Sequence, residues 1–146
     1  MLNPPMTHSN QGLALTEGFE GCRLESYQDS GGIWTIGYGH TSGIGPGMVC
    51  TQDQAVQWLI GDYAWAEAEV NRIVDVPLSQ GEFDGLTDFT FNCGRYALDH
   101  STLLALVNEG DMQDAADQFE RWDKCGGVVV AGLLRRRLAE EQEFLG

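Results

Sequence analysis

Two carboxylates and a hydroxyl lie near the start of the chain at the spacing Glu-x8-Asp-x5-Thr, namely Glu20, Asp29 and Thr35. Acid/base work on a glycosidic bond needs two carboxyl groups in different surroundings, because one donates a proton while the other stays ionised. A nearby hydroxyl can hold a water molecule. By spacing alone, the same residues also fit a solvated helix end, a turn aspartate and an ordinary strand threonine. The neighbouring sequence has to decide between these interpretations.

That neighbouring sequence predicts a helix followed by a glycine-rich hairpin. Apolar residues interleaved with polar ones predict a helix over residues 11–23, ending near Gly21 to Leu24. Residues 26–49 combine many glycines with β-branched and aromatic residues, and Gly31-Gly32 marks a turn, so a small antiparallel hairpin or meander is expected there and nowhere else. Aromatic faces suit sugar rings, and the hairpin offers three: Tyr27, Trp34 and Tyr38.

The rest of the chain reads as helices with recognisable ends. Thr51 followed by Gln54 fits a capping box, opening a long helix that Pro77 ends. Ser79 and Glu82 form a second box, opening a helix that runs to Cys93. Further helices are expected over residues 101–110, 111–122 and 131–144, the last with an apolar side of Leu134, Leu138 and Phe144. The predicted class is α+β: a helical body with a small β lobe near the N-terminus.

Length and composition indicate one globular domain over residues 1–146. Residues 1–10 are expected to form a loose lead-in, because Pro4-Pro5 blocks regular structure. The N-terminus has neither the basic nor the apolar region of a secretory signal, so none is expected. The strongest apolar run, residues 127–134, is far shorter than the roughly 20 residues that span a membrane.

The net charge of −14, from 22 acidic and 8 basic side chains, limits the partners. Binding to nucleic acid and to anionic membrane surfaces both rely on Lys and Arg, so neither is expected.

The four cysteines are Cys22, Cys50, Cys93 and Cys125, with no Cys-x-x-Cys pair. A zinc site is therefore not expected, and the sequence calls for no cofactor. Buried thiols acting as small apolar side chains are favoured, with disulfides as the minor alternative.

The motifs together resemble the phage-type lysozymes, the endolysins of glycoside hydrolase family 24. The resemblance begins with Phe19-Glu20-Gly21-Cys22-Arg23-Leu24, Tyr27-Gln28-Asp29 and Gly32-Ile33-Trp34-Thr35-Ile36-Gly37-Tyr38-Gly39-His40-Thr41. It continues in the family's order through Phe91-Asn92-Cys93-Gly94, Ser101-Thr102-Leu103-Leu104, Asn108-Glu109-Gly110-Asp111, Ala115-Ala116, Phe119-Glu120-Arg121-Trp122, Gly126-Gly127, Gly132-Leu133 and Arg135-Arg136-Arg137. It covers residues 12–146.

The resemblance implies a two-lobed lysozyme-like fold and hydrolysis of the β-1,4 bond between N-acetylmuramic acid and N-acetylglucosamine in peptidoglycan. Carried over by position, Glu20 is the general acid, Asp29 orients or deprotonates a water, and Thr35 holds that water. The family suggests inversion, in which the two carboxyl groups stand about 6.5–9.5 Å apart. The strongly acidic chain departs from expectation, because its field repels an anionic wall.

Candidate roles also fall on a histidine, an asparagine and a run of arginines. His40 is expected to pair structurally with Asp62, the one polar residue in an apolar helical stripe, rather than to act in catalysis. Asn92 either hydrogen-bonds a sugar N-acetyl group or caps its own helix. Arg135, Arg136 and Arg137 either form a solvated face, or one of them pairs with Glu20 or with substrate carboxylates. Consecutive helical residues point in different directions, so at most one or two can do so.

Two rival functions stay open beside the muramidase. A lytic transglycosylase needs the acid but no positioned water, and a non-catalytic peptidoglycan-binding protein could keep the same fold. The expected setting is synthesis in the cytoplasm of a bacterial host, as a monomer, with a separate holin-type protein that permeabilises the membrane. A virion-associated enzyme would have the same sequence features.

Overall fold

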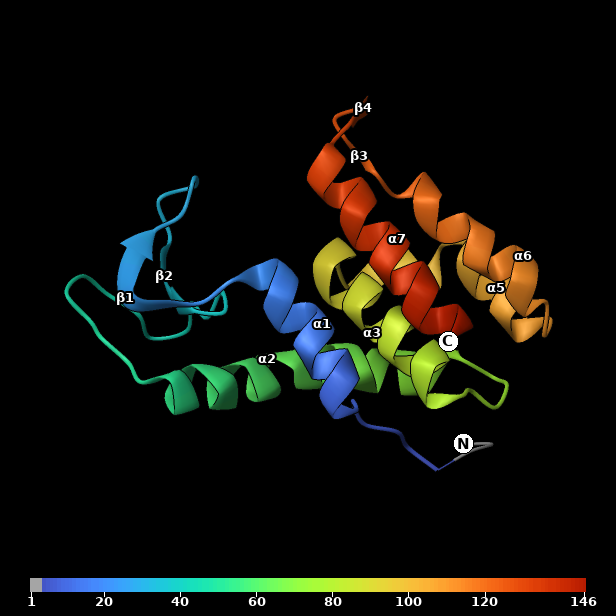
Figure 1. Cartoon of the computed structure of the whole chain (residues 1–146), viewed down its shortest axis with the longest axis horizontal. Helices are drawn as coiled ribbons and strands as arrows, with labels where there is room; N and C mark the ends of the chain where they lie inside the picture. The colour runs from blue at the N-terminus through green and yellow to red at the C-terminus, as the bar shows by residue number, and fades with distance from the viewer. Residues whose placement is uncertain (1–3) are drawn as a thin grey trace. The chain divides into compact units, whose positions relative to one another are not determined.

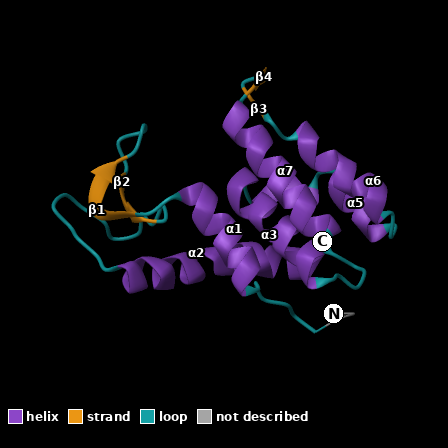
Figure 2. Ribbon diagram, viewed as in Figure 1, coloured by secondary structure: helices purple, strands orange, loops and turns teal. Residues whose placement is uncertain are grey.

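The computed structural model describes residues 4–146 as a mostly helical chain with little β-structure (Figures 1 and 2). It divides into two compact units. Unit 1 comprises Met1–Leu15 and Ala66–Gly146, and unit 2 comprises Thr16–Trp65. The predicted α+β class, with a small β lobe near the N-terminus, is confirmed. Within the described residues, no helix combines the length and the apolar character needed to cross a membrane.

Unit 2 holds the predicted hairpin. Helix α1 (Asn10–Glu20) leads into strands β1 (Arg23–Gln28) and β2 (Trp34–Gly37), which pair antiparallel. The helix ends before the predicted range, at Glu20, because Gly21 has φ 68°, a left-handed conformation that stops a helix. The chain is therefore already extended at Arg23, which the sequence had placed in the helix.

Helix α2 (Gln52–Ile73) begins at the predicted cap, where the Thr51 hydroxyl accepts from Gln54 N–H at 3.1 Å. Its first turn packs closely against β2, because a Cβ placed on Gly37 would lie only 3.1 Å from the Ala55 Cβ. The core of unit 2 consists of side chains that are at most 9% exposed, namely Ile36, Tyr38, Ala55, Leu59 and Tyr63. This packing holds β2 against α2.

Unit 1 is a helical body built on α3 (Gln80–Cys93) and α7 (Ala131–Leu145), which lie against each other (Figure 1). The Ser79–Glu82 capping box forms with both of its hydrogen bonds, as predicted. The remaining elements are α4 (Arg95–Asp99), α5 (Thr102–Asn108), α6 (Met112–Gln118), a 3-10 turn (Phe119–Arg121), β3 (Lys124–Cys125) and β4 (Val128–Val129).

Aromatic rings fill the centre of unit 1. Phe89 of α3 meets Phe119 and Trp122 edge to face, with ring centroids 5.8 and 5.2 Å apart. Phe119 also contacts Phe144 at 5.4 Å, which joins α7 to the same cluster. Each fully buried aromatic side chain contributes about 1.5–3 kcal/mol. Trp122 is thus a packing residue.

The expectation of a single β region was wrong, because β3 and β4 form a second small hairpin in unit 1 (Figure 2). Gly126 and Gly127 have φ 59° and 80°, the backbone that a tight two-residue turn requires. The sequence showed the glycine break, but strands of two residues are too short to display alternation. The five-residue helix α4 was missed for the same reason of length.

The predicted loose lead-in falls partly outside the described residues, at 1–3. Residues 4–9 form no helix or strand, yet hydrogen bonds attach them to the rest of unit 1. The Met6 backbone exchanges two hydrogen bonds with the Asn71 amide, at 3.0 and 2.9 Å. His8 N–H donates to Glu67, and the Ser9 hydroxyl donates to Asp84 at 2.5 Å. Buried carboxylates therefore hold the start of α1.

Gly12 depends directly on the buried Asp84. A Cβ at Gly12 would lie 2.4 Å from the Asp84 Cγ, and hydrogen bonds from Ser9 and Gln80 hold that carboxylate in place. We expect Gly12→Ala to lower the free energy of unfolding by about 1–3 kcal/mol through overpacking. The matched control is Gly18→Ala in the same helix, where nothing lies within 4 Å. It should raise stability by about 0.5–1 kcal/mol. Urea unfolding of both variants checks this, and equal effects would contradict the contact.

Candidate active site

Glu20 is the last residue of α1, and its side chain is partly buried. Its Oε1 lies 3.6 Å from the point where a Cβ at Gly39 would stand. Gly39 has φ 84°, so the chain there can approach a carboxylate closely without a side chain intervening. The carboxyl group thus lies beside the backbone that follows β2.

Asp29 closes the turn of the β1–β2 hairpin. Its Oδ1 accepts hydrogen bonds from the backbone N–H groups of Gly31 at 2.8 Å and Ile33 at 2.9 Å. The backbone N–H of Asp29 also donates to the Ile33 carbonyl at 2.9 Å. One carboxylate oxygen is therefore fixed by the turn. The residue is exposed, and within residues 4–146 no hydrogen-bond donor meets its Oδ2.

Thr35 lies in β2 opposite Tyr27 and is 4% exposed. Its hydroxyl donates to the Ile33 carbonyl at 2.9 Å. A hydroxyl has one proton and two lone pairs, so the oxygen can still accept a hydrogen bond from a water. The backbone of Ile33 links the two predicted residues, since its N–H serves Asp29 and its C=O serves Thr35. Nothing in the sequence pattern had marked Ile33.

The structure brings His40 and Asp62 together, with His40 Nδ1 2.7 Å from Asp62 Oδ2. The His40 ring also stacks on Trp58 of α2, with centroids 4.7 Å apart and planes within 5°. Both contacts join the residue that follows the hairpin to α2. The arrangement is that of a side chain used for attachment within unit 2.

Asn92 belongs to unit 1 and accepts a hydrogen bond there. Its Oδ1 receives Arg137 Nη2 at 2.7 Å, a partner that neither sequence alternative had named. Arg137 also donates to Glu140 at 2.8 Å and to the Cys93 sulfur at 2.7 Å. Asn92 thus contacts a buried arginine while remaining exposed itself. The predicted hydrogen bond from Asn92 to a sugar N-acetyl group stays a prediction.

The interpretation of the arginine run as a solvated helix face was wrong for Arg136 and Arg137. Their side chains are buried, and Arg136 makes two hydrogen bonds of 2.9 Å to Asp88 of α3. Arg135 is exposed.

The predicted apolar side of α7 was wrong as well, because Leu138 is 40% exposed whereas Glu140 is fully buried. The charged residues face α3 because α3 offers Asp88 inside the body of unit 1.

Burial has consequences for protonation in this charged cluster. Desolvation, and then the neighbouring Asp88, raise the pKa of Glu140, while Arg137 opposes that rise. Arg137 Nε approaches Glu140 Oε1 to 2.7 Å as an ion pair without hydrogen-bond alignment. Burial likewise raises the pKa of the Cys93 thiol to about 11, against the effect of Arg137. Cys93 is thus a structural thiol.

All four cysteines are free thiols. The expectation that all are buried was wrong: Cys125 in β3 is exposed, and the other three are partly buried. No group of three or more His, Cys, Asp or Glu side chains among residues 4–146 is arranged to hold a metal ion.

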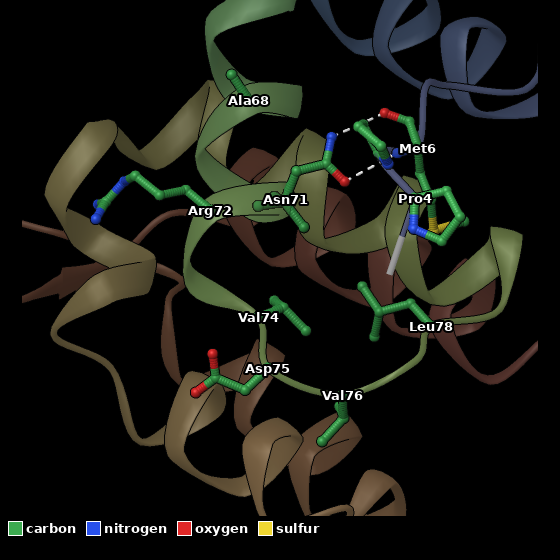
Figure 3. Close-up of a pocket in the computed structure, with 11 residues that line it drawn as sticks. Pro4, Met6, Ala68, Asn71, Arg72, Val74, Asp75, Val76 and Leu78 are labelled. Carbon is green, nitrogen blue, oxygen red and sulfur yellow. Dashed lines mark hydrogen bonds between the residues drawn. The ribbon is translucent and has the colours of Figure 1, made fainter. Parts of the chain in front are cut away.

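A pocket of about 590 Å³ lies in unit 1 and contains none of the predicted site residues (Figure 3). Apolar side chains form most of its wall, and the two hydrogen bonds between Met6 and Asn71 close one side. The lining residues are Pro4, Pro5, Met6, Ala68, Val70, Asn71, Arg72, Val74, Asp75, Val76 and Leu78.

Residues 17–140 match the family model described as phage lysozyme. The chain is 40% identical over 140 residues to the endolysin of Acyrthosiphon pisum secondary endosymbiont phage 1, covering 93% of this chain and 96% of that protein. The chain belongs to the phage lysozyme family.

Solved structures agree with this membership. A mutant of the lysozyme of phage P22 has a TM-score of 0.90 and 37% identity, covering 97% of this chain and 99% of that one. The muramidase domain of SpmX from Asticaccaulis excentricus has a TM-score of 0.89 and 38% identity, covering 96% and 99%. As a phage lysozyme the chain is a glycoside hydrolase.

The arginine run yields a matched test of the buried ion pairs. We expect Arg136→Met to lower the free energy of unfolding by about 3–5 kcal/mol, because it removes the guanidinium that makes two hydrogen bonds to the fully buried Asp88 carboxylate. Arg135→Met, at the exposed neighbouring position, should change it by no more than about 0.5 kcal/mol. Urea denaturation measures both. Equal losses, or none at Arg136, would show that the Asp88 pair does not stabilise unit 1.

Proposed function

We propose that this phage lysozyme is an endolysin muramidase. In this proposal residues 1–146 act as one catalytic domain that hydrolyses the β-1,4 bond between N-acetylmuramic acid and N-acetylglucosamine in peptidoglycan, which lyses the host cell. The observation that carries it is the hairpin in which the Ile33 backbone joins Asp29 to Thr35, with the Glu20 carboxyl beside Gly39 in the same unit. The similarity to the muramidase domain of SpmX, at 38% identity, supports the choice of bond.

In the proposed mechanism, Glu20 donates its proton to the glycosidic oxygen as the bond from that oxygen to the anomeric carbon breaks. A water attacks the same carbon from the opposite face, and its proton passes to Asp29 Oδ2. The other oxygen of Asp29 is held by two backbone N–H groups, so the carboxylate cannot turn away. The Thr35 oxygen accepts a hydrogen bond from the water and so orients it. The configuration at the anomeric carbon is therefore inverted in the product.

The positioned water separates this proposal from a lytic transglycosylase. Transglycosylation closes a 1,6-anhydro ring and needs no external water, so Thr35 and the turn-bound Asp29 would have no task. A non-catalytic wall-binding protein would have no use for a carboxyl at Glu20 either. Inside the host cell, the enzyme would await a holin-type protein that opens the membrane and would then act on the wall as a monomer.

The catalytic assignment is tested with charge-removing variants of similar shape. We expect Glu20→Gln to lower the rate of peptidoglycan hydrolysis at least about 100-fold, because the amide has no proton to donate to the leaving oxygen. Asp29→Asn should also abolish most activity while keeping Oδ1 as the acceptor of the turn. The matched control is Glu25→Gln, at an exposed position in β1, which should hydrolyse at the wild-type rate.

Mass spectrometry of the soluble fragments completes that test. Hydrolysis leaves reducing N-acetylmuramic acid ends, whereas 1,6-anhydro ends would assign the chain to the transglycosylases. Lysis retained by a folded Glu20→Gln enzyme would remove Glu20 from the acid role.

The net charge of −14 predicts an unusual response to salt. Repulsion between this chain and the anionic wall is screened as the Debye length falls from about 30 Å at 0.01 M to about 8 Å at 0.15 M salt. Clearing of purified cell walls should therefore hold or accelerate from low salt to several hundred millimolar. A steep decline over this range would mean that a local attraction, and not general repulsion, controls encounter.

A further inference from the structure

The backbone beside Glu20 belongs to a very tight loop. Ile36 and His40 exchange two backbone hydrogen bonds of 2.9 Å, which close a tip made of Gly37, Tyr38 and Gly39. Gly37 and Gly39 have φ 65° and 84°, so the tip relies on two left-handed glycines. Because Tyr38 and Gly39 are neighbours in this three-residue tip, a contact that fixes the Tyr38 side chain also restrains the backbone of Gly39.

The Tyr38 hydroxyl is held by the first residue of α2. Tyr38 is 9% exposed, and its oxygen accepts a hydrogen bond from Gln52 Nε2 at 2.7 Å. Burial raises the pKa of Tyr38, Gln52 lowers it, and the nearby Glu17 and Cys22 raise it. Glu17 lies three residues before Glu20 on the same side of α1, and Cys22 lies two residues after Glu20. The hydroxyl therefore lies among groups that flank Glu20 on both sides.

Gln52 uses the other end of its amide on one of these flanking groups. The Cys22 thiol donates to Gln52 Oε1, with Sγ and Oε1 3.6 Å apart. One planar amide thus contacts the residue next to Gly39 and the segment that leaves Glu20. Gln52 itself begins a 22-residue helix whose first turn packs under Gly37. Gln52 therefore contacts the chain on both sides of the Glu20 carboxyl group.

From these contacts we propose that Tyr38 and Gln52 are a pair of positioning residues. Their hydrogen bond holds the Gly37–Gly39 tip and the end of α1 in register, so that the Glu20 carboxyl meets the leaving oxygen. This rests on the proposed role of Glu20 as the acid. Neither side chain is assigned any contact with the reacting atoms. The pair matters because a misplacement of about 1 Å in a catalytic group can reduce the rate about 100-fold.

The test uses variants that delete the hydrogen bond with little change of shape. Tyr38→Phe removes only the hydroxyl, and Gln52→Met replaces the amide by an uncharged chain of similar length. Gln57→Met is the matched control, at an exposed position on the same helix. Initial rates on soluble, uncross-linked glycan strands from purified peptidoglycan give kcat and KM, and thermal unfolding reports the folded state.

We expect each positioning variant to lose about tenfold in kcat, with KM changed less than about twofold, because binding of the glycan is not affected. The double variant should lose clearly less than the roughly hundredfold product of the two single losses, since both changes break the same Tyr38–Gln52 hydrogen bond. The control should match the wild type. A kcat within twofold of the wild type in both single variants overturns the proposal. Losses that multiply in the double variant also overturn it.

Failure here differs from failure of the proposed function. If folded Glu20→Gln is inactive while Tyr38→Phe keeps full kcat, the acid assignment stands and only the positioning role falls. If Glu20→Gln remains active, both fall together. A lower melting temperature with an unchanged kcat in the folded enzyme would reveal a structural role alone, and that result also counts against positioning.

Discussion

The chemistry proposed for unit 2 depends on one short turn, in which the Asp29 carboxylate accepts hydrogen bonds from two backbone N–H groups and the Ile33 carbonyl accepts one from the Thr35 hydroxyl. A five-residue connection rich in glycine would otherwise sample many conformations, and ordering it costs entropy. The carboxylate that closes the turn is the one proposed to handle the water. The same hydrogen bonds thus shape the backbone of the turn and fix the orientation of the Asp29 carboxylate.

Glu20 is positioned by different means. It ends a helix, and a left-handed glycine follows it. One of its carboxyl oxygens lies beside Gly39, in a tip whose side chain, Tyr38, is hydrogen-bonded to the first residue of α2. The two carboxyl groups therefore lie in unlike environments, one exposed in a polar turn and one partly buried near a helix end.

Unit 1 is stabilised by an unusual core, in which aromatic rings lie next to two arginines and two acids. Removing these charges from water is costly, and the pairs with Asp88 and Glu140 offset that cost only if every partner is kept. Of the chain's 8 basic residues, two are therefore buried as the partners of acidic side chains. These pairs remove equal numbers of acidic and basic groups from the surface, so the net charge of −14 is expected to make encounter with an anionic wall dependent on salt.

The sequence by itself determined the family, the α+β class, the Thr51 cap of α2, the capping box of α3, and the first hairpin. These are local signals: a cap, a glycine turn or a helical period acts over a few residues. It also indicated His40 and Asp62 as partners, because a lone polar residue in an apolar stripe needs a partner.

Only the tertiary structure decided the burial of Arg136 and Arg137, the exposure of Leu138 and Cys125, and the hydrogen bond between Tyr38 and Gln52. A side chain's polarity does not reveal which partner the fold will bring to it, because burial of a charge depends on an opposite charge from a distant helix. Asp88 lies 48 residues before Arg136, and no local pattern connects them.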